Sequence, residues 1–247
     1  TKKQIIDLFK KQKKLISSSE IIDLQYSEGR ILSQDIKSQI NIPPFNNSAV
    51  DGYALLKNDL NLKKTFICKK RIAAGDNKKI VVKSGEAVRV FTGAKMPSNS
   101  STVVMQENVR VKGNYITLLK TPQFGENYRI KGEDIKKNKI ILTKGTKINH
   151  QNLNLIAAAG VRKIKENKKI KIGFFTSGNE LRKPTKKLKN AEINNSNYYA
   201  LNTLLDKKYI TKKYLGNLKD NLVTVKKSLI KSSNSAEYGS RKFGLTE

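Results

Sequence analysis

Short segments of this sequence concentrate glycine, hydroxyl and carboxylate side chains, the groups that bind oxyanions and hard metal ions. The first, residues 43–54, begins with two prolines that fix an extended backbone and places the carboxylate of Asp51–Gly52 at a flexible corner. The second, residues 89–94, ends a β-type run in Thr92–Gly93, a hydroxyl next to a glycine amide that can hold an oxyanion such as phosphate. Taken singly, each segment is more typical of a turn than of a binding site.

Two further segments add carboxylates. Residues 132–135 read Gly-Glu-Asp-Ile, and their two adjacent acids can order a metal ion or cap the next element. Residues 176–181 read Thr-Ser-Gly-Asn-Glu-Leu, and the polar run 194–197 that follows them can cap a helix. Because the free amides of a helix N-terminus favour anions, this part of the chain suits a phosphate group.

The elements that must position these segments change in type along the chain. Residues 5–16 place apolar side chains near a 3.6-residue period between lysines, which predicts an amphipathic helix. From residue 29 to 119, short β-type runs alternate with Gly and Asn turns and predict a β-rich module, with a tight turn at Gly113–Asn114. The runs are residues 30–32, 80–82, 87–91, 102–105 and 115–119.

The pattern becomes helical again near Asn149, which can cap a helix that stops at Gly160. After a lysine-rich link, residues 170–175 predict a strand and residues 197–205 a helix, the opening of an α/β unit. Ligands of open α/β sheets bind outside the carboxyl ends of the strands, so we expect chemistry in the loop that begins at residue 176.

Composition excludes several classes of protein. The 247 residues include 50 Lys+Arg against 20 Asp+Glu, a net charge of +30 that attracts polyanions. Only eight of the basic residues are arginine and the lysines are scattered, which favours a solvated lysine-rich surface over specific nucleic-acid binding, although a polyanion binder stays an alternative.

A lone Cys68 and a lone His150 exclude an internal disulfide and a Cys–His zinc site. The longest apolar stretch, Leu155–Val161, is too short to span a membrane, so we expect a cytoplasmic protein.

The four segments are more specific as an ordered set than singly. They read Asn-Asn-Ser-Ala-Val-Asp-Gly-Tyr-Ala (46–54), Thr-Gly-Ala-Lys-Met-Pro (92–97), Gly-Glu-Asp-Ile (132–135) and Ser-Gly-Asn-Glu-Leu (177–181). This set resembles the molybdopterin molybdenumtransferase family, the MoeA and gephyrin E-domain proteins, over about residues 5–230. The resemblance implies molybdenum cofactor biosynthesis: insertion of molybdate into adenylylated molybdopterin with release of AMP, in an Mg²⁺-dependent step carried out by a homodimer, with a molybdopterin adenylyltransferase as functional neighbour.

The resemblance also assigns roles to residues. The positions that match the family's functional residues, and that we expect to be catalytic, are Asp51, Thr92, Asp134, Glu180 and Asp220. Of these, Asp51, Glu180 and Asp220 are the expected ligands of Mg²⁺, which prefers hard oxygen atoms, whereas Asp134 is expected to orient its neighbours. The expected substrate-binding residues are Ser48, Gly52, Gly93, Ser177, Gly178, Ser196 and Asn197.

The implied fold class is α+β and α/β multidomain. We expect a helical dimerisation domain from residues 1–28 and 132–168, an inserted β-rich module from residues 29–131, and the start of a three-layer α/β molybdopterin-binding domain in residues 169–247. In the family this last domain continues into a second buried strand and a Ser-Gly-Gly-Val-Ser-x-Gly loop, which this sequence lacks. We therefore expect an incomplete form with one central strand and two helices. A non-catalytic dimeric scaffold that binds a partner is the alternative.

Overall fold

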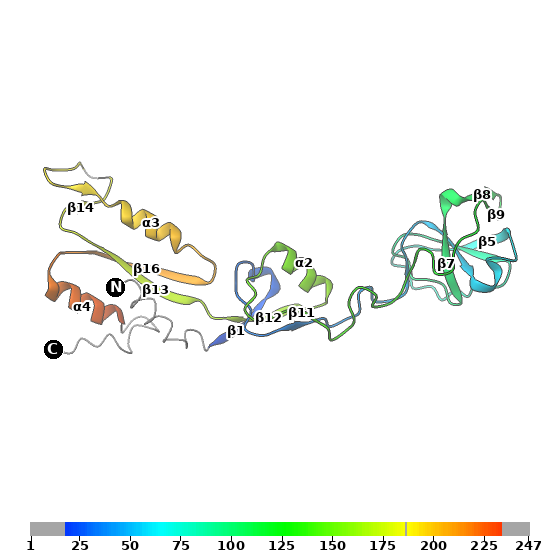
Figure 1. Cartoon of the computed structure of the whole chain (residues 1–247), viewed down its shortest axis with the longest axis horizontal. Coiled ribbons are helices and arrows are strands. Elements are labelled where there is room, and N and C mark those ends of the chain that lie inside the picture. The colour runs from blue at the N-terminus through cyan, green and yellow to red at the C-terminus, as the bar shows by residue number, and fades with distance from the viewer. Residues whose placement is uncertain (1–17, 186, 234–247) are drawn as a thin grey trace. The chain divides into compact units, whose positions relative to one another are not determined.

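The computed structural model describes residues 18–185 and 187–233, which fold as two compact units (Figure 1). The described part of unit 1 comprises residues 18–36, 142–157, 162–185 and 187–233, and unit 2 comprises residues 37–141 and 158–161. The amphipathic helix expected at residues 5–16 lies outside the described residues. None of the helices within the described ranges is long and apolar enough to cross a membrane.

Unit 2 is built on a six-stranded sheet with the order β7-β4-β6-β5-β9-β8. Its strands are β4 (Gly52–Leu56), β5 (Thr65–Ile72), β6 (Glu86–Val90), β7 (Ser100–Met105), β8 (Val109–Lys112) and β9 (Tyr115–Leu118). Strands β5 and β6 are parallel, and the other neighbouring pairs are antiparallel. The smaller elements are η2 (Lys57–Asp59), η3 (Gln106–Asn108) and the antiparallel pair β3 (Asn47–Ser48) and β10 (Tyr128–Arg129).

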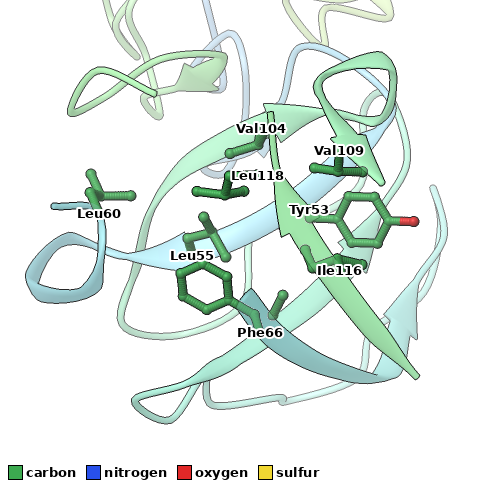
Figure 2. Close-up of a cluster of buried hydrophobic side chains, with 9 residues drawn as sticks. Tyr53, Leu55, Leu60, Phe66, Val104, Val109, Ile116 and Leu118 are labelled. Carbon is green, nitrogen blue, oxygen red and sulfur yellow. The ribbon is translucent and has the colours of Figure 1, made fainter. Parts of the chain in front are cut away.

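The sheet of unit 2 buries side chains on both faces. Successive residues of a strand point to opposite faces, and in β4 Tyr53 and Leu55 enter one hydrophobic cluster whereas Ala54 enters another. Figure 2 shows the first cluster, in which Phe66 and Ile116 of neighbouring strands are each 1% exposed. Because neither face of β4 is left to solvent, its sequence is a continuous apolar run without alternation. This pattern does not mark a half-exposed strand, so β4 was not among the predicted strands.

Three of the β-type runs expected in this part of the chain are confirmed as β6, β7 and β9. The tight turn is confirmed as well, since Lys112 and Tyr115 are opposite each other in the β8–β9 hairpin and Gly113 supplies the left-handed residue at φ +59°. The other two runs, residues 30–32 and 80–82, make only isolated bridges.

Unit 1 contains an antiparallel pair of β1 (Ser19–Asp23) and β12 (Lys163–Asn167), followed after β1 by η1 (Leu24–Tyr26). The lysine-rich stretch expected to be a link is therefore a strand, because its alternate residues Ile164 and Glu166 are buried while the lysines between them are exposed. Within residues 132–168, which we expected to be helical, α2 (His150–Ala158) is the one helix. Its predicted cap is confirmed, since Asn149 Oδ1 accepts a hydrogen bond from the Asn152 amide at 2.8 Å. Short strands β2 (Ile36–Lys37) and β11 (Ile140–Leu142) pair with each other.

The α/β part of unit 1 has two central strands. β13 (Ile170–Ser177) and β16 (Ile210–Leu218) are parallel neighbours, with α3 (Ser196–Leu204) against β13 and α4 (Leu222–Ser233) against β16 (Figure 1). A second, short parallel pair is β14 (Leu181–Arg182) and β15 (Ile193–Asn194). The expectation of a single central strand was wrong. Lys212 and Lys213 interrupt the apolar pattern of β16, so its sequence does not predict a strand.

Candidate functional site

The first two segments meet where β4 begins and β6 ends. Antiparallel pairing sets Gly52 opposite Val90, so that Asp51, one residue before Gly52, and Thr92, two residues after Val90, are close together. Asp51 Oδ1 accepts hydrogen bonds from both the amide and the hydroxyl of Thr92, each at 2.8 Å. These two bonds, with a smaller contribution from the charge of Arg89, hold the pKa of Asp51 below its usual value. The arrangement is an ionised carboxylate with a fixed orientation.

The donors expected to bind an oxyanion here are already engaged. The Thr92 amide and hydroxyl are used by Asp51, and the Gly93 amide donates to the Ser48 carbonyl oxygen at 2.8 Å. The Ser48 side chain, which is 1% exposed, donates to the Val50 carbonyl oxygen at 2.6 Å. This corner therefore offers a carboxylate oxygen to a ligand, and its nearest hydrogen-bond donors are occupied inside the protein.

Gly52 is required by packing. A Cβ atom at this position would lie 2.1 Å from the carbonyl oxygen of Val104 on the neighbouring strand β7, far inside van der Waals contact. Only glycine permits β4 and β7 to approach this closely. The glycine thus lets the strand that follows Asp51 pack against β7, and its expected role in substrate binding stays a prediction.

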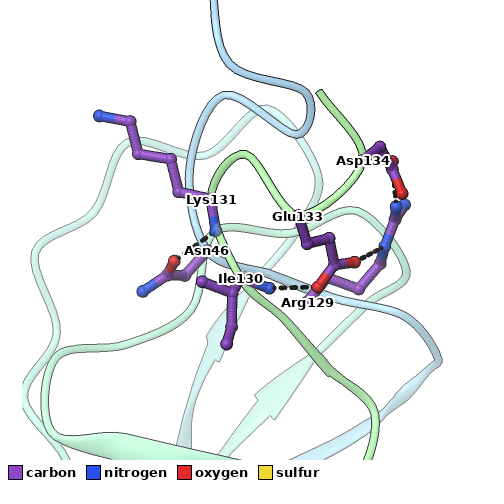
Figure 3. Close-up of polar contacts among 6 residues, drawn as sticks. All are labelled: Asn46, Arg129, Ile130, Lys131, Glu133 and Asp134. Carbon is purple, nitrogen blue, oxygen red and sulfur yellow. Dashed lines mark hydrogen bonds and ion pairs between the residues drawn. The ribbon is translucent and has the colours of Figure 1, made fainter. Parts of the chain in front are cut away.

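The third segment is organised around an arginine that the sequence analysis did not single out. Arg129 of β10 donates from Nε to Glu133 at 2.6 Å and also forms an ion pair with Asp134, while the Ile130 amide donates to Glu133 at 2.8 Å (Figure 3). The two carboxylates raise the pKa of Arg129, chiefly through these hydrogen bonds. The spacing of an arginine four and five residues before two acids is the signal that could have identified it.

A side chain from the first segment also takes part in this arrangement. Asn46 Oδ1 accepts a hydrogen bond from the Lys131 amide at 2.8 Å, and its amide group donates to the Tyr128 hydroxyl at 2.7 Å (Figure 3). Gly132, the first residue of the third segment, is tied to the first segment through its own amide, which donates to the Pro43 carbonyl oxygen at 2.9 Å. The structure therefore joins the first and third segments by hydrogen bonds within unit 2.

The fourth segment lies in unit 1, at the carboxyl ends of the parallel strands β13 and β16. Ser177, the last residue of β13, donates from its hydroxyl to Asp220 Oδ1 at 2.8 Å, and the Asn179 amide donates to Asp220 Oδ2 at 3.4 Å. As with Asp51 and Thr92, a hydroxyl side chain orients an aspartate. The Gly178 amide is also engaged, since it donates to the Leu218 carbonyl oxygen at 3.1 Å.

The position of the Glu180 carboxylate depends on a glycine two residues earlier in the chain, Gly178. Gly178 has φ +149°, and a Cβ atom there would lie 2.7 Å from both carboxylate oxygens of Glu180. Among the described residues, no donor hydrogen-bonds to the Glu180 side chain, so both oxygens are open to a ligand. The carbonyl oxygen of Gly178 is fixed by the Asn217 side-chain amide at 2.8 Å.

A buried polar network, which the sequence analysis missed, supports this loop. Asn195 is 7% exposed, and its side-chain amide donates to Thr176 Oγ1 at 2.8 Å while its oxygen caps α3 by accepting from the Tyr198 amide. Thr176 Oγ1 also contacts the Tyr214 hydroxyl at 2.8 Å. The expected binding residues Ser196 and Asn197 are exposed at the first turn of α3, next to this cap.

The expected site residues thus fall into two groups. Asp51, Thr92 and Asp134 belong to unit 2, whereas Ser177, Glu180 and Asp220 belong to unit 1. Within the described ranges, no cluster of three or more His, Cys, Asp and Glu side chains is placed to hold a metal ion. In the part that the structure describes, neither unit therefore surrounds a metal ion with three or more of these side chains.

Comparison with known proteins gives consistent matches. Residues 2–160 match the family described as the MoeA N-terminal region (domain I and II). The chain is 33% identical over 222 residues to a molybdopterin molybdenumtransferase of Haemophilus influenzae, covering 90% of this chain and 55% of the relative. It is 32% identical over 224 residues to a molybdopterin molybdenumtransferase of a Nostoc species, covering 89% and 51%. The chain spans about half the length of these curated relatives.

Solved structures agree with this result. The molybdopterin biosynthesis MoeA protein from Pyrococcus horikoshii superposes with a TM-score of 0.83 at 31% identity, over 90% of this chain and 60% of that one. A second structure of a Pyrococcus MoeA protein gives a TM-score of 0.82 at 27% identity. Similarity in sequence and in structure therefore extends over both units.

Proposed function

Because the chain belongs to the family of the MoeA N-terminal region, we propose that it acts in molybdenum cofactor biosynthesis, in the insertion of molybdate into adenylylated molybdopterin with release of AMP. The relatives that carry the name molybdopterin molybdenumtransferase support the proposal at the level of the pathway. The substrate, the product and the contribution of this chain's residues are the parts that an experiment must test.

The Asp51–Thr92 pair carries the proposal. Two hydrogen bonds of 2.8 Å fix the Asp51 carboxylate and keep it ionised, and both go to Oδ1. Among the described residues, Oδ2 accepts no hydrogen bond and is left for a ligand. A charge that is oriented before the ligand arrives costs no reorganisation during the reaction, which is the main electrostatic device of enzymes. Thr92 is in this proposal a positioning residue for Asp51.

The carboxylates fit the way in which proteins usually hold magnesium. Since the described residues form no cluster that could enclose a metal, an all-protein cage is not what they offer. Magnesium in phosphate-processing sites is instead commonly held by one or two carboxylates, with ligand oxygens and water completing its shell. We propose Asp51 in unit 2, and Glu180 and Asp220 in unit 1, as the carboxylates available to hold it in this way. When bound, the ion would supply positive charge between two anionic substrates.

The remaining parts of the proposal rest on family likeness. We propose that the chain acts within a homodimer and that its substrate is supplied by a molybdopterin adenylyltransferase. Asp134 orients Arg129 through their ion pair, and the Asn195 network orients the loop that carries Ser177 and Glu180.

The test is a measurement of AMP release. A chimera in which the C-terminal remainder of the Haemophilus influenzae relative follows α4 is supplied with adenylylated molybdopterin, molybdate and Mg²⁺, and AMP is quantified by chromatography. We expect AMP release that requires molybdate. The matched variants are Asp51→Asn and Asp76→Asn, because Asp76 is also an aspartate of unit 2 whose pKa is lowered by a backbone hydrogen bond, from Ala73.

We expect Asp51→Asn to reduce turnover by two orders of magnitude or more, on the order of the loss of a preorganised electrostatic group, while Asp76→Asn retains it. Far-ultraviolet circular dichroism of both variants checks that the fold is kept. An intact chimera that binds adenylylated molybdopterin and never releases AMP would favour the scaffold alternative.

A further inference from the structure

A guanidinium group lies over two aromatic rings next to the Asp51–Thr92 pair. Arg89 of β6 is directly opposite Tyr53 of β4, and Phe91 follows it two residues along the chain. The guanidinium carbon is 4.8 Å from the centre of the Tyr53 ring and 5.2 Å from that of the Phe91 ring. Two such cation–π contacts restrict the plane of the guanidinium.

The surroundings of Arg89 restrict this orientation further. Tyr53 is 8% exposed and belongs to the hydrophobic cluster of Figure 2, together with Leu55 and Phe66. The side-chain oxygen of Gln106 accepts a hydrogen bond from Arg89 Nη2, and the Gln106 amide donates to the Asp51 carbonyl oxygen at 3.1 Å. One residue thus connects the guanidinium to the backbone of the carboxylate that the proposed function uses.

The charge of Arg89 is not neutralised by a direct contact. Within the described part of the chain, no Asp or Glu oxygen lies within 4.0 Å of its guanidinium nitrogens, and Gln106 takes up one of its five N–H donors. By contrast, the donors that the sequence pointed to, on Thr92 and Gly93, are engaged inside the protein. The N–H donors next to Asp51 that make no hydrogen bond within the described residues therefore belong to Arg89.

We infer that Arg89 binds a tetrahedral oxyanion, with the open edge of its stacked guanidinium turned to oxygens of a ligand beside Asp51. A planar guanidinium presents parallel N–H groups that match two oxygens of such an anion, which a lysine ammonium cannot do. This inference deepens the proposed function and rests on it, because it assigns to this corner either the molybdate or a phosphate group of the nucleotide-bearing substrate. Asp51 and Arg89 would then contact opposite charges of one assembled ligand.

The experiment uses the whole chain and two probes, inorganic molybdate and inorganic phosphate, each titrated separately. The readout is the Nε–H resonance of Arg89 in a ¹⁵N nuclear magnetic resonance spectrum, which is assignable because the chain has eight arginines. Since a net charge of +30 attracts anions unspecifically, each titration is repeated at about 50 mM and about 300 mM salt. We expect a saturable shift of this resonance, and the probe that binds more tightly identifies molybdate or phosphate as the source.

Matched variants separate the effect of the planar guanidinium of Arg89 from the effect of its positive charge alone. Arg71 is the Cα partner of Arg89 on the neighbouring strand β5 and is exposed, so Arg71→Gln removes the same charge without touching the stack. We expect Arg89→Gln to weaken binding of the tighter probe, measured by calorimetry, about tenfold or more and Arg71→Gln to change it less than about twofold. Arg89→Lys keeps the charge and Phe91→Leu keeps the arginine, so both serve if Arg89→Gln does not fold. Arg89→Lys should lose most of the affinity and Phe91→Leu part of it.

Two results overturn the inference: equal weakening by Arg89→Gln and Arg71→Gln, or an Arg89 resonance that does not respond to either probe. Failure of the proposed function is recognised separately in the chimera. If the chimera releases AMP and its Arg89→Gln variant does so at the same rate, only the inference about Arg89 fails. If Arg89 binds an oxyanion and the chimera never releases AMP, only the proposed reaction fails.

Discussion

Replacement of a fully buried carboxyl group by its amide is expected to remove a pH-dependent loss of stability from unit 1. Glu166 of β12 is 0% exposed, and neither of its side-chain oxygens has a hydrogen-bond partner among the described residues. Arg30 lies 3.5 Å away, but it also binds Glu20, which is opposite Glu166 in the β1–β12 pair. One guanidinium therefore serves two carboxylates, of which Glu166 is the buried one.

Burial, reinforced by the charge of Glu20 and opposed by that of Arg30, raises the pKa of Glu166 from 4.5 to about 7. Between these two values the folded chain keeps a proton that the unfolded chain releases, so stability falls as the pH rises through this range. At about 1.4 kcal/mol for each tenfold change in proton affinity, the loss is about 3 kcal/mol by pH 8. Glu166→Gln cannot ionise and should lack this loss.

The assay compares unfolding of unit 1 at several pH values. Wild type and Glu166→Gln are titrated with urea at about pH 4, 6 and 8, and a brief hydrogen-exchange pulse at one fixed pH reports on peptides that cover β1 and β12. The free-energy difference between the two proteins should shift by about 3 kcal/mol in favour of the variant from the lowest to the highest pH.

Two further variants test the cause of the shift. Glu20→Gln removes a neighbouring negative charge and should reduce the pH-dependent loss, because the pKa of Glu166 then moves back toward its usual value. Glu86→Gln, at a partly exposed carboxylate paired with Lys70 in unit 2, should leave it unchanged. A difference between wild type and Glu166→Gln that is flat with pH, or of opposite sign, would refute the reasoning.

Three more outcomes follow from the structure. Gly52→Ala should destabilise unit 2 by about 3 kcal/mol or prevent its folding, since the new methyl group would overlap the Val104 carbonyl oxygen; thermal unfolding of the variant measures this. Asn195→Ala should cost about 1–2 kcal/mol, because α3 loses its cap and Thr176 a donor; a urea midpoint equal to that of wild type would contradict it. Because its pKa is lowered, Asp51 should stay ionised below its usual range, and a carboxyl-group nuclear magnetic resonance titration that gives an ordinary pKa would disprove the hydrogen bonds from Thr92.

Local sequence signals were sufficient for those elements whose stabilising interactions are close in sequence. The hairpin turn at Gly113 and the cap at Asn149 were identified because a left-handed glycine and a side-chain cap act within a few residues. Strands β4 and β16 were not identified. The first is apolar on both faces, and the second has lysines between its apolar residues, so neither shows the alternation that marks a strand half exposed to solvent.

The sequence by itself determined the family, through four ordered segments, and it determined which residue types are available for chemistry. The tertiary structure decided how those groups are used. Hydroxyls that appeared free for an oxyanion donate to Asp51 and Asp220 instead, and an arginine that lies over two rings is left with unused donors. Strand pairing over some forty residues brings these groups together, and hydrogen bonds at that separation depend on register and burial, which no local pattern encodes.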